Sequence, residues 1–237
     1  MKRFWDTAST IQAADGVGWQ VMLDGKPVRV PGGAPVLLPV APLADAVAAE
    51  WQAAGGGKGG ELSYADLPLT RIAGTAQERI APNPEPVVLE LAQYGQSDLL
   101  CYRAPHPPVL TARQEAAWQP WLDWADRRFA ARLAATQGII HVPQDPGALA
   151  ALAGAVASLH PFALGALGVA VPALGSLVLG LALADGELAQ EEAFRLSILD
   201  ELFQEELWGP DAEAVKRRAN MAADVAVAAR FLELLRA

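Results

Sequence analysis

Between residues 19 and 38, short runs of apolar and polar positions are typical of β-strands. Apolar-rich runs cover residues 19–23, 26–30 and 36–38. Asp24-Gly25 separates the first two runs, and an Asp-Gly pair in that place is a strong signal for a hairpin turn. Residues 31–33, Pro-Gly-Gly, supply a second turn. The pattern therefore predicts a small antiparallel meander at the N-terminus.

Helical spacing starts soon afterwards. A helix is expected over residues 42–51, because Pro42 suits a first helical turn. A glycine-rich loop follows at residues 55–60, and residues 67–71 are expected to be extended. Three prolines within residues 81–86 break any regular element and predict a domain boundary.

Beyond this boundary, apolar residues recur every three or four positions up to the C-terminus. Helices are expected over residues 87–94, 113–132, 149–159, 175–184, 190–208 and 211–235. The predicted fold class is α+β. A small antiparallel β-rich N-terminal domain with one helix, residues 1–84, precedes an all-helical C-terminal domain, residues 85–237.

One apolar segment is long enough to raise the question of a membrane span. Residues 147–184 contain no Asp, Glu, Lys or Arg. However, Pro161 and Pro172 interrupt the segment, and no cluster of Lys or Arg flanks it. Two short helices enclosed in the core are the better interpretation, and no stable membrane insertion is predicted.

Composition narrows the class of protein. Hydrophobic residues make up 52% of the 237 residues and charged residues 19%, which favours a sizeable core over a disordered chain. The net charge of -9 disfavours nucleic acid as a partner. No apolar run follows Lys2 and Arg3 as it would in a signal peptide. The expected location is the bacterial cytoplasm, unless the chain is a mature form that has already been trimmed.

Motifs that would carry chemistry are missing from the sequence. The glycine loop resembles a phosphate loop only superficially, because Gly59 follows Lys58 where the motif has Ser or Thr. Ser176 lies outside a G-x-S-x-G motif, and the single cysteine and three scattered histidines match no usual zinc spacing. No catalytic residue, cofactor or metal is therefore predicted, which favours a binding protein.

The helix expected over residues 190–208 holds the most informative pattern. An apolar stripe is formed by Ala193, Leu196, Leu199, Phe203 and Leu207. Asp200 falls inside this stripe, where a carboxylate is costly unless it is paired or hydrogen-bonded. On the opposite face, Phe194 and Ile198 lie beside Glu201 and Glu205. Exposed apolar groups rimmed by charge are typical of a protein interface.

Other interpretations of this helix stay open. Asp200 can pair with a core arginine, namely Arg71, Arg79 or Arg103, and hold the two domains together. Phe194 and Ile198 can pack under the last helix. A different class of function is a small-molecule enzyme whose pocket lies between the domains, with Asp200 as general acid or base.

Several short motifs occur in an order that resembles a known family. They are Arg3-Phe4-Trp5, Leu23–Val28, Ala49–Trp51, Leu67–Arg71, Asp98–Arg103, Arg113-Gln114 followed by Trp118, Gly175–Val178, and Leu199–Glu201 with Gln204, Trp208 and Gly209. The chain resembles, over nearly its whole length, the assembly chaperones of the F-type ATP synthase catalytic sector that act on the α subunit. These chaperones occur in mitochondria and in α-proteobacteria, so the resemblance implies a location in the mitochondrial matrix if the chain is from a eukaryote.

The resemblance implies a small β-rich N-terminal domain, a helical C-terminal domain and no ATP hydrolysis. It also implies that the protein binds the unassembled α subunit and prevents its aggregation until the β subunit replaces it. A functionally important acid of the family falls at Asp200, where many members have Glu. The expected partner-binding residues are Asp200, Glu201, Gln204, Trp208, Phe194 and Ile198.

Overall fold

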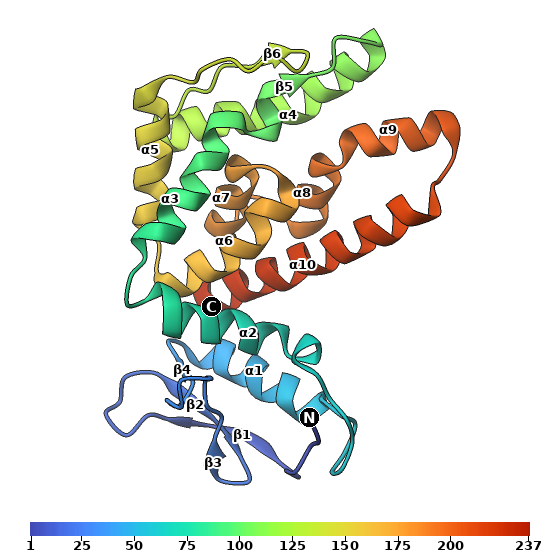
Figure 1. Ribbon diagram of the computed structural model, residues 1–237. Helices are drawn as coiled ribbons and strands as arrows, with labels where there is room; N and C mark the ends of the chain where they lie inside the picture. The colour runs from blue at the N-terminus through green and yellow to red at the C-terminus, as the bar shows by residue number, and fades with distance from the viewer. The chain divides into compact units, whose positions relative to one another are not determined.

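A computed structural model describes the whole chain, residues 1–237 (Figure 1). Its contacts divide the chain into two compact units. The first, here the N-terminal unit, comprises residues 1–84, 160–166 and 230–237, and the second, here the helical unit, comprises residues 85–159 and 167–229. Because segments after residue 84 also belong to the N-terminal unit, the division into domains 1–84 and 85–237 stays a prediction.

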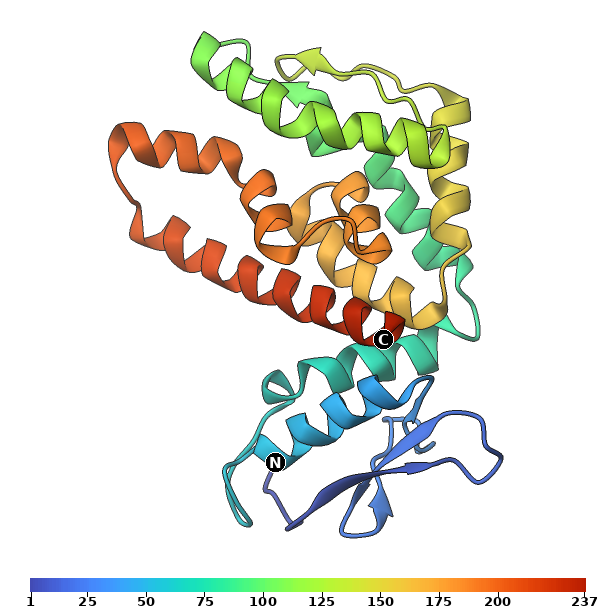
Figure 2. The same cartoon turned by 180° about the vertical axis from the view of Figure 1, so that it is seen from behind.

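The N-terminal sheet has four antiparallel strands, with β2 at its centre. These are β1 (Ala8–Gln12), β2 (Trp19–Leu23), β3 (Lys26–Pro27) and β4 (Leu37–Leu38). Strand β2 pairs with each of the other three (Figure 2). The predicted hairpin is confirmed: Asp24 and Gly25 have φ of 47° and 80°, as a tight turn with two left-handed residues requires. Strand β1 was not predicted.

Helix α1 (Ala41–Ala53) packs against β1 and β2 and buries one side there. The short η1 (Tyr64–Asp66) leads into α2 (Pro68–Thr75), which a π-helical turn, η2 (Ala76–Ile80), extends. The expectation that residues 67–71 are extended is therefore wrong. Pro68 opens the helix, and the Glu50 carboxylate of α1 accepts the backbone N–H groups of Leu69 and Thr70 at 2.7 and 3.0 Å.

Substituting Glu50 with Ala should destabilise the protein by about 1–2 kcal/mol, the usual effect of losing a helix cap. Glu50 also accepts the Thr70 hydroxyl at 2.6 Å, so three donors lose their acceptor together. The measurement is urea unfolding followed by circular dichroism. Asp45→Ala is the matched control, because Asp45 lies on the same helix and accepts one exposed bond from Thr10. Equal effects of the two substitutions would contradict the capping role.

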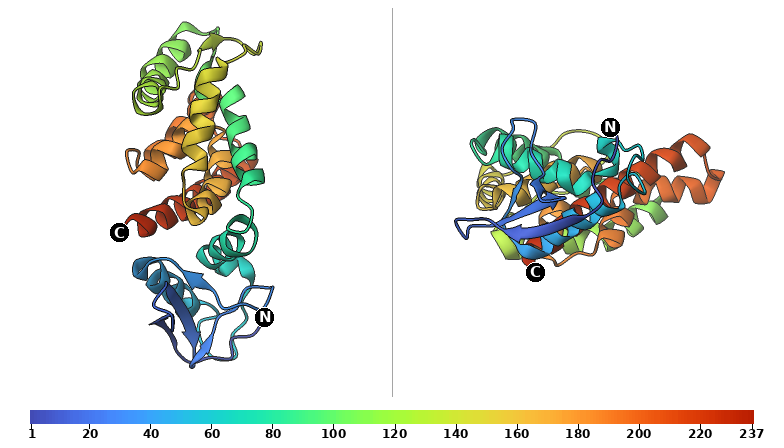
Figure 3. Two further views of the ribbon diagram at one scale, coloured as in Figure 1. Left: turned by 90° about the vertical axis from the view of Figure 1, so that its left-hand side faces the viewer. Right: turned by 90° about the horizontal axis from the view of Figure 1, so that it is seen from below.

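The helical part of the chain confirms the α+β class. It contains α3 (Glu85–Gln93), η3 (Tyr94–Ser97), η4 (Leu99–Cys101), α4 (Pro108–Phe129), α5 (Pro146–Ala157), α6 (Pro161–Leu174), α7 (Leu177–Asp185), α8 (Gln190–Ser197), α9 (Leu199–Trp208) and α10 (Ala212–Arg236). Helices α3 and α5 lie side by side (Figure 3). One departure from an all-helical region is a parallel pair of two-residue strands, β5 (Tyr102–Arg103) and β6 (Thr136–Gln137).

The segment without charged residues forms α5, α6 and α7, three helices where two were expected. Residues 177–183 of α7 are buried on every side, which explains why this helix is apolar all round. Pro161 opens α6, whereas Pro172 lies inside it. No helix of the protein combines the length and apolar character that crossing a bilayer requires.

The buried carboxylate of Asp98 accepts a hydrogen bond from the first turn of α7. Asp98, which is fully enclosed, accepts the backbone N–H of Val178 at 3.0 Å and that of Leu100 at 3.1 Å. Burial raises the pKa of Asp98 to about 6, although its hydrogen bonds act in the opposite direction. Asp98 therefore ties the η4 turn to the start of α7 through backbone donors that would otherwise be unsatisfied.

The predicted helix over residues 190–208 is two helices, α8 and α9. Ile198 separates them, with φ of -110° and ψ of 17°. Because neither Pro nor Gly lies at this break, the apolar periodicity of the sequence continues across it and predicts one helix. The Ser197 hydroxyl donates to the Phe194 carbonyl at 2.8 Å, a local bond of the kind that bends helices.

Candidate functional site

Asp200 lies in the first turn of α9 and bonds to a side chain of α4. Its Oδ1 accepts the Nε2–H of Gln114 at 2.6 Å. The carboxylate is half-buried; burial raises the pKa of Asp200, and the hydrogen bond from Gln114 lowers it. Among the arginines considered as partners, Arg103 pairs instead with Glu115 at 3.2 Å. The cost of a carboxylate on an apolar stripe is thus offset by an amide.

Ion pairs hold α9 to the helices on either side of it. Glu201 pairs with Arg217 of α10 at 3.0 Å, and Glu205 pairs with Arg218. On the other side, Glu206 pairs with Arg113 of α4 at 2.6 Å. Figure 2 shows α9 and the adjoining part of α10 as neighbouring arms of a hairpin. The pairs of Arg113 and Arg217 are exposed and contribute little stability, whereas the pair of Glu205 with Arg218 is partly buried.

The tip of α9 exposes large apolar side chains. Trp208 is 78% exposed and Leu207 is 57% exposed, although Leu207 was expected to continue the buried stripe. Gln204, one turn earlier, is also exposed. Ile198, which lies at the break between α8 and α9, is only 6% exposed, so of the two interpretations left open the structure favours a packed side chain. Phe194 is half-buried. The exposed apolar face is therefore at the C-terminal end of α9.

Comparisons with known proteins decide the family. The family model described as ATP12 chaperone protein matches residues 2–126. A crystal structure of Atp12 from Paracoccus denitrificans matches with 42% sequence identity and a TM-score of 0.91, covering 98% of this chain and 97% of that chain. The chain belongs to the ATP12 chaperone family. This family acts in ATP synthase assembly, so the resemblance seen in the sequence is confirmed.

Two further structures agree with this membership in the ATP12 family. An Asp-to-Lys mutant of the Paracoccus protein matches with the same identity, coverage and TM-score. The Atu1473 protein of Agrobacterium tumefaciens, described as a candidate chaperone, matches with 38% identity and a TM-score of 0.92, over 99% of this chain and 86% of that one. The sources of these structures fit the α-proteobacterial character expected from the sequence.

A small apolar pocket lies between α4 and α9 of this ATP12-family chain, with a volume of about 390 Å³. It is lined by Arg113, Ala116, Ala117, Arg195, Leu199, Leu202, Phe203 and Glu206. Ala116 and Ala117 of α4 line it together with Phe203 of α9, and the Arg113 guanidinium lies 5.2 Å from the centre of the Phe203 ring. This arrangement suits an apolar side chain better than a polar ligand.

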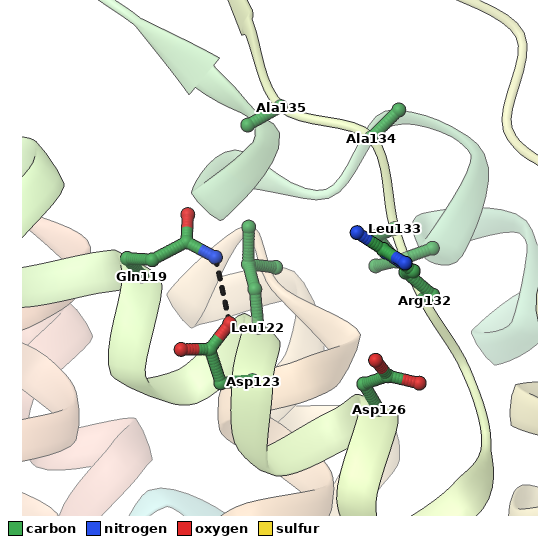
Figure 4. Close-up of a pocket in the computed structure, with 8 residues that line it drawn as sticks. All are labelled: Gln119, Leu122, Asp123, Asp126, Arg132, Leu133, Ala134 and Ala135. Carbon is green, nitrogen blue, oxygen red and sulfur yellow. Dashed lines mark hydrogen bonds between the residues drawn. The ribbon is translucent and has the colours of Figure 1, made fainter.

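A second pocket of about 670 Å³ is formed by α4 and residues 132–135 (Figure 4). Its polar groups are Asp123, Asp126, Arg132 and Gln119, whose Nε2 donates to Asp123 at 2.8 Å. Neither this pocket nor the α4–α9 pocket is lined by Asp200, His, Cys or Ser. The arrangement offers donors and acceptors for binding, but no nucleophile with an adjacent base.

Gln114 belongs to one of the family motifs in the sequence, but it is not among the expected partner-binding residues. It is 0% exposed, and its Oε1 accepts the backbone N–H of Ala104 at 2.6 Å. The signal was present: Gln114 stands between Leu110 and Trp118 on the buried stripe of α4, as Asp200 stands on the stripe of α9. A polar residue on an apolar stripe indicates a buried hydrogen bond in both helices.

Proposed function

We propose that this ATP12-family protein binds the unassembled α subunit of the ATP synthase catalytic sector and prevents its aggregation until the β subunit replaces it. The observation that carries the proposal is the composition of α9. This helix combines an exposed Trp208 and Leu207 with the half-buried Asp200, whose carboxylate bonds to an amide rather than to a cation. Exposed Trp with adjoining charge is characteristic of a protein-binding surface.

The physical reason for such a chaperone lies in the partner. An obligate subunit interface is large and apolar, on the order of 2,000 Å² or more. An unassembled subunit that leaves such a surface bare tends to aggregate. The proposed contact residues are Asp200, Glu201, Gln204, Trp208, Phe194 and Ile198, of which Ile198 is buried in the free protein. Binding must stay weak enough for the β subunit to displace the chaperone.

The proposal includes the absence of a catalytic step and a location in the bacterial cytoplasm. An enzyme that used Asp200 as acid or base would place it against a bound small molecule. Because Asp200 lines neither of the two pockets described above, no observation favours that alternative. The absence of a catalytic step and the cytoplasmic location are therefore proposed together with the chaperone role.

Co-expression with the α subunit alone tests the function. The intact protein should raise the soluble fraction of the α subunit, and Asp200→Lys should abolish this increase. The lysine would repel a cationic donor of the partner, and burying its ammonium group in the half-buried position would be costly. Soluble α subunit is measured in the supernatant by gel. Asp224→Lys, which makes the same charge change at an exposed position of α10, is the control and should retain the gain.

Two results would contradict the proposal. One is an α subunit that stays insoluble beside the intact, folded protein. The other is equal loss of solubility with Asp200→Lys and Asp224→Lys, which would make net charge rather than position the cause.

A further inference from the structure

We propose that Gln114 is a positioning residue, which holds one oxygen of the Asp200 carboxylate and so presents the other oxygen to a donor group of the partner. The inference rests on the proposed function, in which Asp200 contacts the α subunit. The Gln114 Nε2 donates to Oδ1 of Asp200 at 2.6 Å. Oδ2 has no hydrogen bond within the protein, and it is therefore the oxygen left for a partner.

The orientation of the Gln114 amide is fixed at its other end. Its Oε1 accepts the Ala104 backbone N–H at 2.6 Å, so the NH₂ group must face Asp200. The side chain is 0% exposed and is enclosed by the buried stripe of α4. A buried amide with both ends bonded has little freedom to rotate. It therefore restrains the carboxylate in a way that an exposed side chain would not.

None of the ion pairs that α4, α9 and α10 form involves Asp200. Arg113 of α4 pairs with Glu206, Arg217 of α10 pairs with Glu201, and Arg103 pairs with Glu115. Oδ2 is therefore available to a charged donor of the partner, and the chemistry that fits is a lysine or arginine side chain of the α subunit. Burial raises the pKa of Asp200, and the bond from Gln114 opposes that effect by lowering it.

Gln114→Glu is the most direct test, because it exchanges the donating NH₂ for an oxygen and keeps the length of the side chain and the acceptor for Ala104. Two carboxyl groups then face each other. The amount of α subunit that co-purifies with tagged chaperone should fall about tenfold or more, the usual effect of losing a hydrogen bond to a charged group. Gln119→Glu is the matched control: Gln119 is also on α4 and donates to Asp123 at 2.8 Å. It should leave co-purification unchanged.

A double-mutant cycle separates positioning from general damage. In an Asp200→Ala background, Gln114→Glu should change co-purification by less than about twofold, because its effect acts through Asp200. An equal loss in both backgrounds would overturn the inference while leaving the proposed function intact. Should Gln114→Glu fail to fold, as shown by its thermal midpoint, Gln114→Met removes the donor without adding charge and enters the same cycle. If the wild-type protein captures no α subunit, the proposed function fails, and this inference fails with it.

Discussion

Replacing Trp118 with alanine should destabilise the protein by about 3–5 kcal/mol, the range for emptying the site of a large buried aromatic side chain. The ring is only 1% exposed, at the middle of α4. Its Nε1 donates to the Leu196 carbonyl of α8 at 3.0 Å, and the Arg103 guanidinium lies 5.3 Å from its centre. Alanine would leave a cavity, a carbonyl without its donor and a buried cation without its aromatic neighbour.

Urea unfolding followed by circular dichroism measures this effect. Trp124→Ala is the matched control, because Trp124 lies on the same helix but is half-buried and makes edge contacts with Trp121 and Phe129. Trp118→Phe separates the two contributions: it keeps most of the packing and should cost about 1–2 kcal/mol for the lost hydrogen bond and smaller ring. Equal losses of stability in Trp118→Ala and Trp124→Ala would contradict the larger packing contribution expected of Trp118.

Local signals predicted the parts of the fold that depend on neighbouring residues. The hairpin at Asp24-Gly25 and the helix after Val40 were found because their turn and N-terminal residues lie next to them in the sequence. Strand β1 was not predicted, because its extended conformation depends on pairing with β2, in which Thr10 lies opposite Val21. Helix α2 was misassigned for a similar reason, since its cap, Glu50, is far away along the chain.

The same distinction applies to the candidate site. Asp200 was found because a carboxylate on an apolar stripe conflicts with its surroundings, and such conflicts indicate function or a hidden partner. The partner itself, Gln114, lies 86 positions away and required the structure. The sequence left both burial and exposure open for Ile198, since periodicity assumes an unbroken helix and the structure breaks the helix at that residue.

Changing Trp208 to serine should weaken binding of the α subunit about tenfold or more and leave the stability of the chaperone nearly unchanged. The side chain is 78% exposed at the end of α9, so little packing is lost within the protein. An exposed Trp that becomes buried in a complex is among the residues whose truncation costs 2 kcal/mol or more, roughly a factor of thirty in affinity. A large loss of affinity for the α subunit with an unchanged thermal midpoint would therefore identify Trp208 as a contact residue.

Ile140→Ser provides the control, because Ile140 is also 78% exposed but lies in the loop after β6 rather than on α9. Both variants remove an exposed apolar side chain, so any general effect of surface hydrophobicity on the solubility of the α subunit should be shared. The comparison requires the fraction of α subunit bound at several chaperone concentrations, together with the thermal midpoint of each variant. If Trp208→Ser and Ile140→Ser bind alike, α9 is not the contact surface. If only Ile140→Ser loses binding, the contact moves to the loop after β6, and Asp200 must act through another surface.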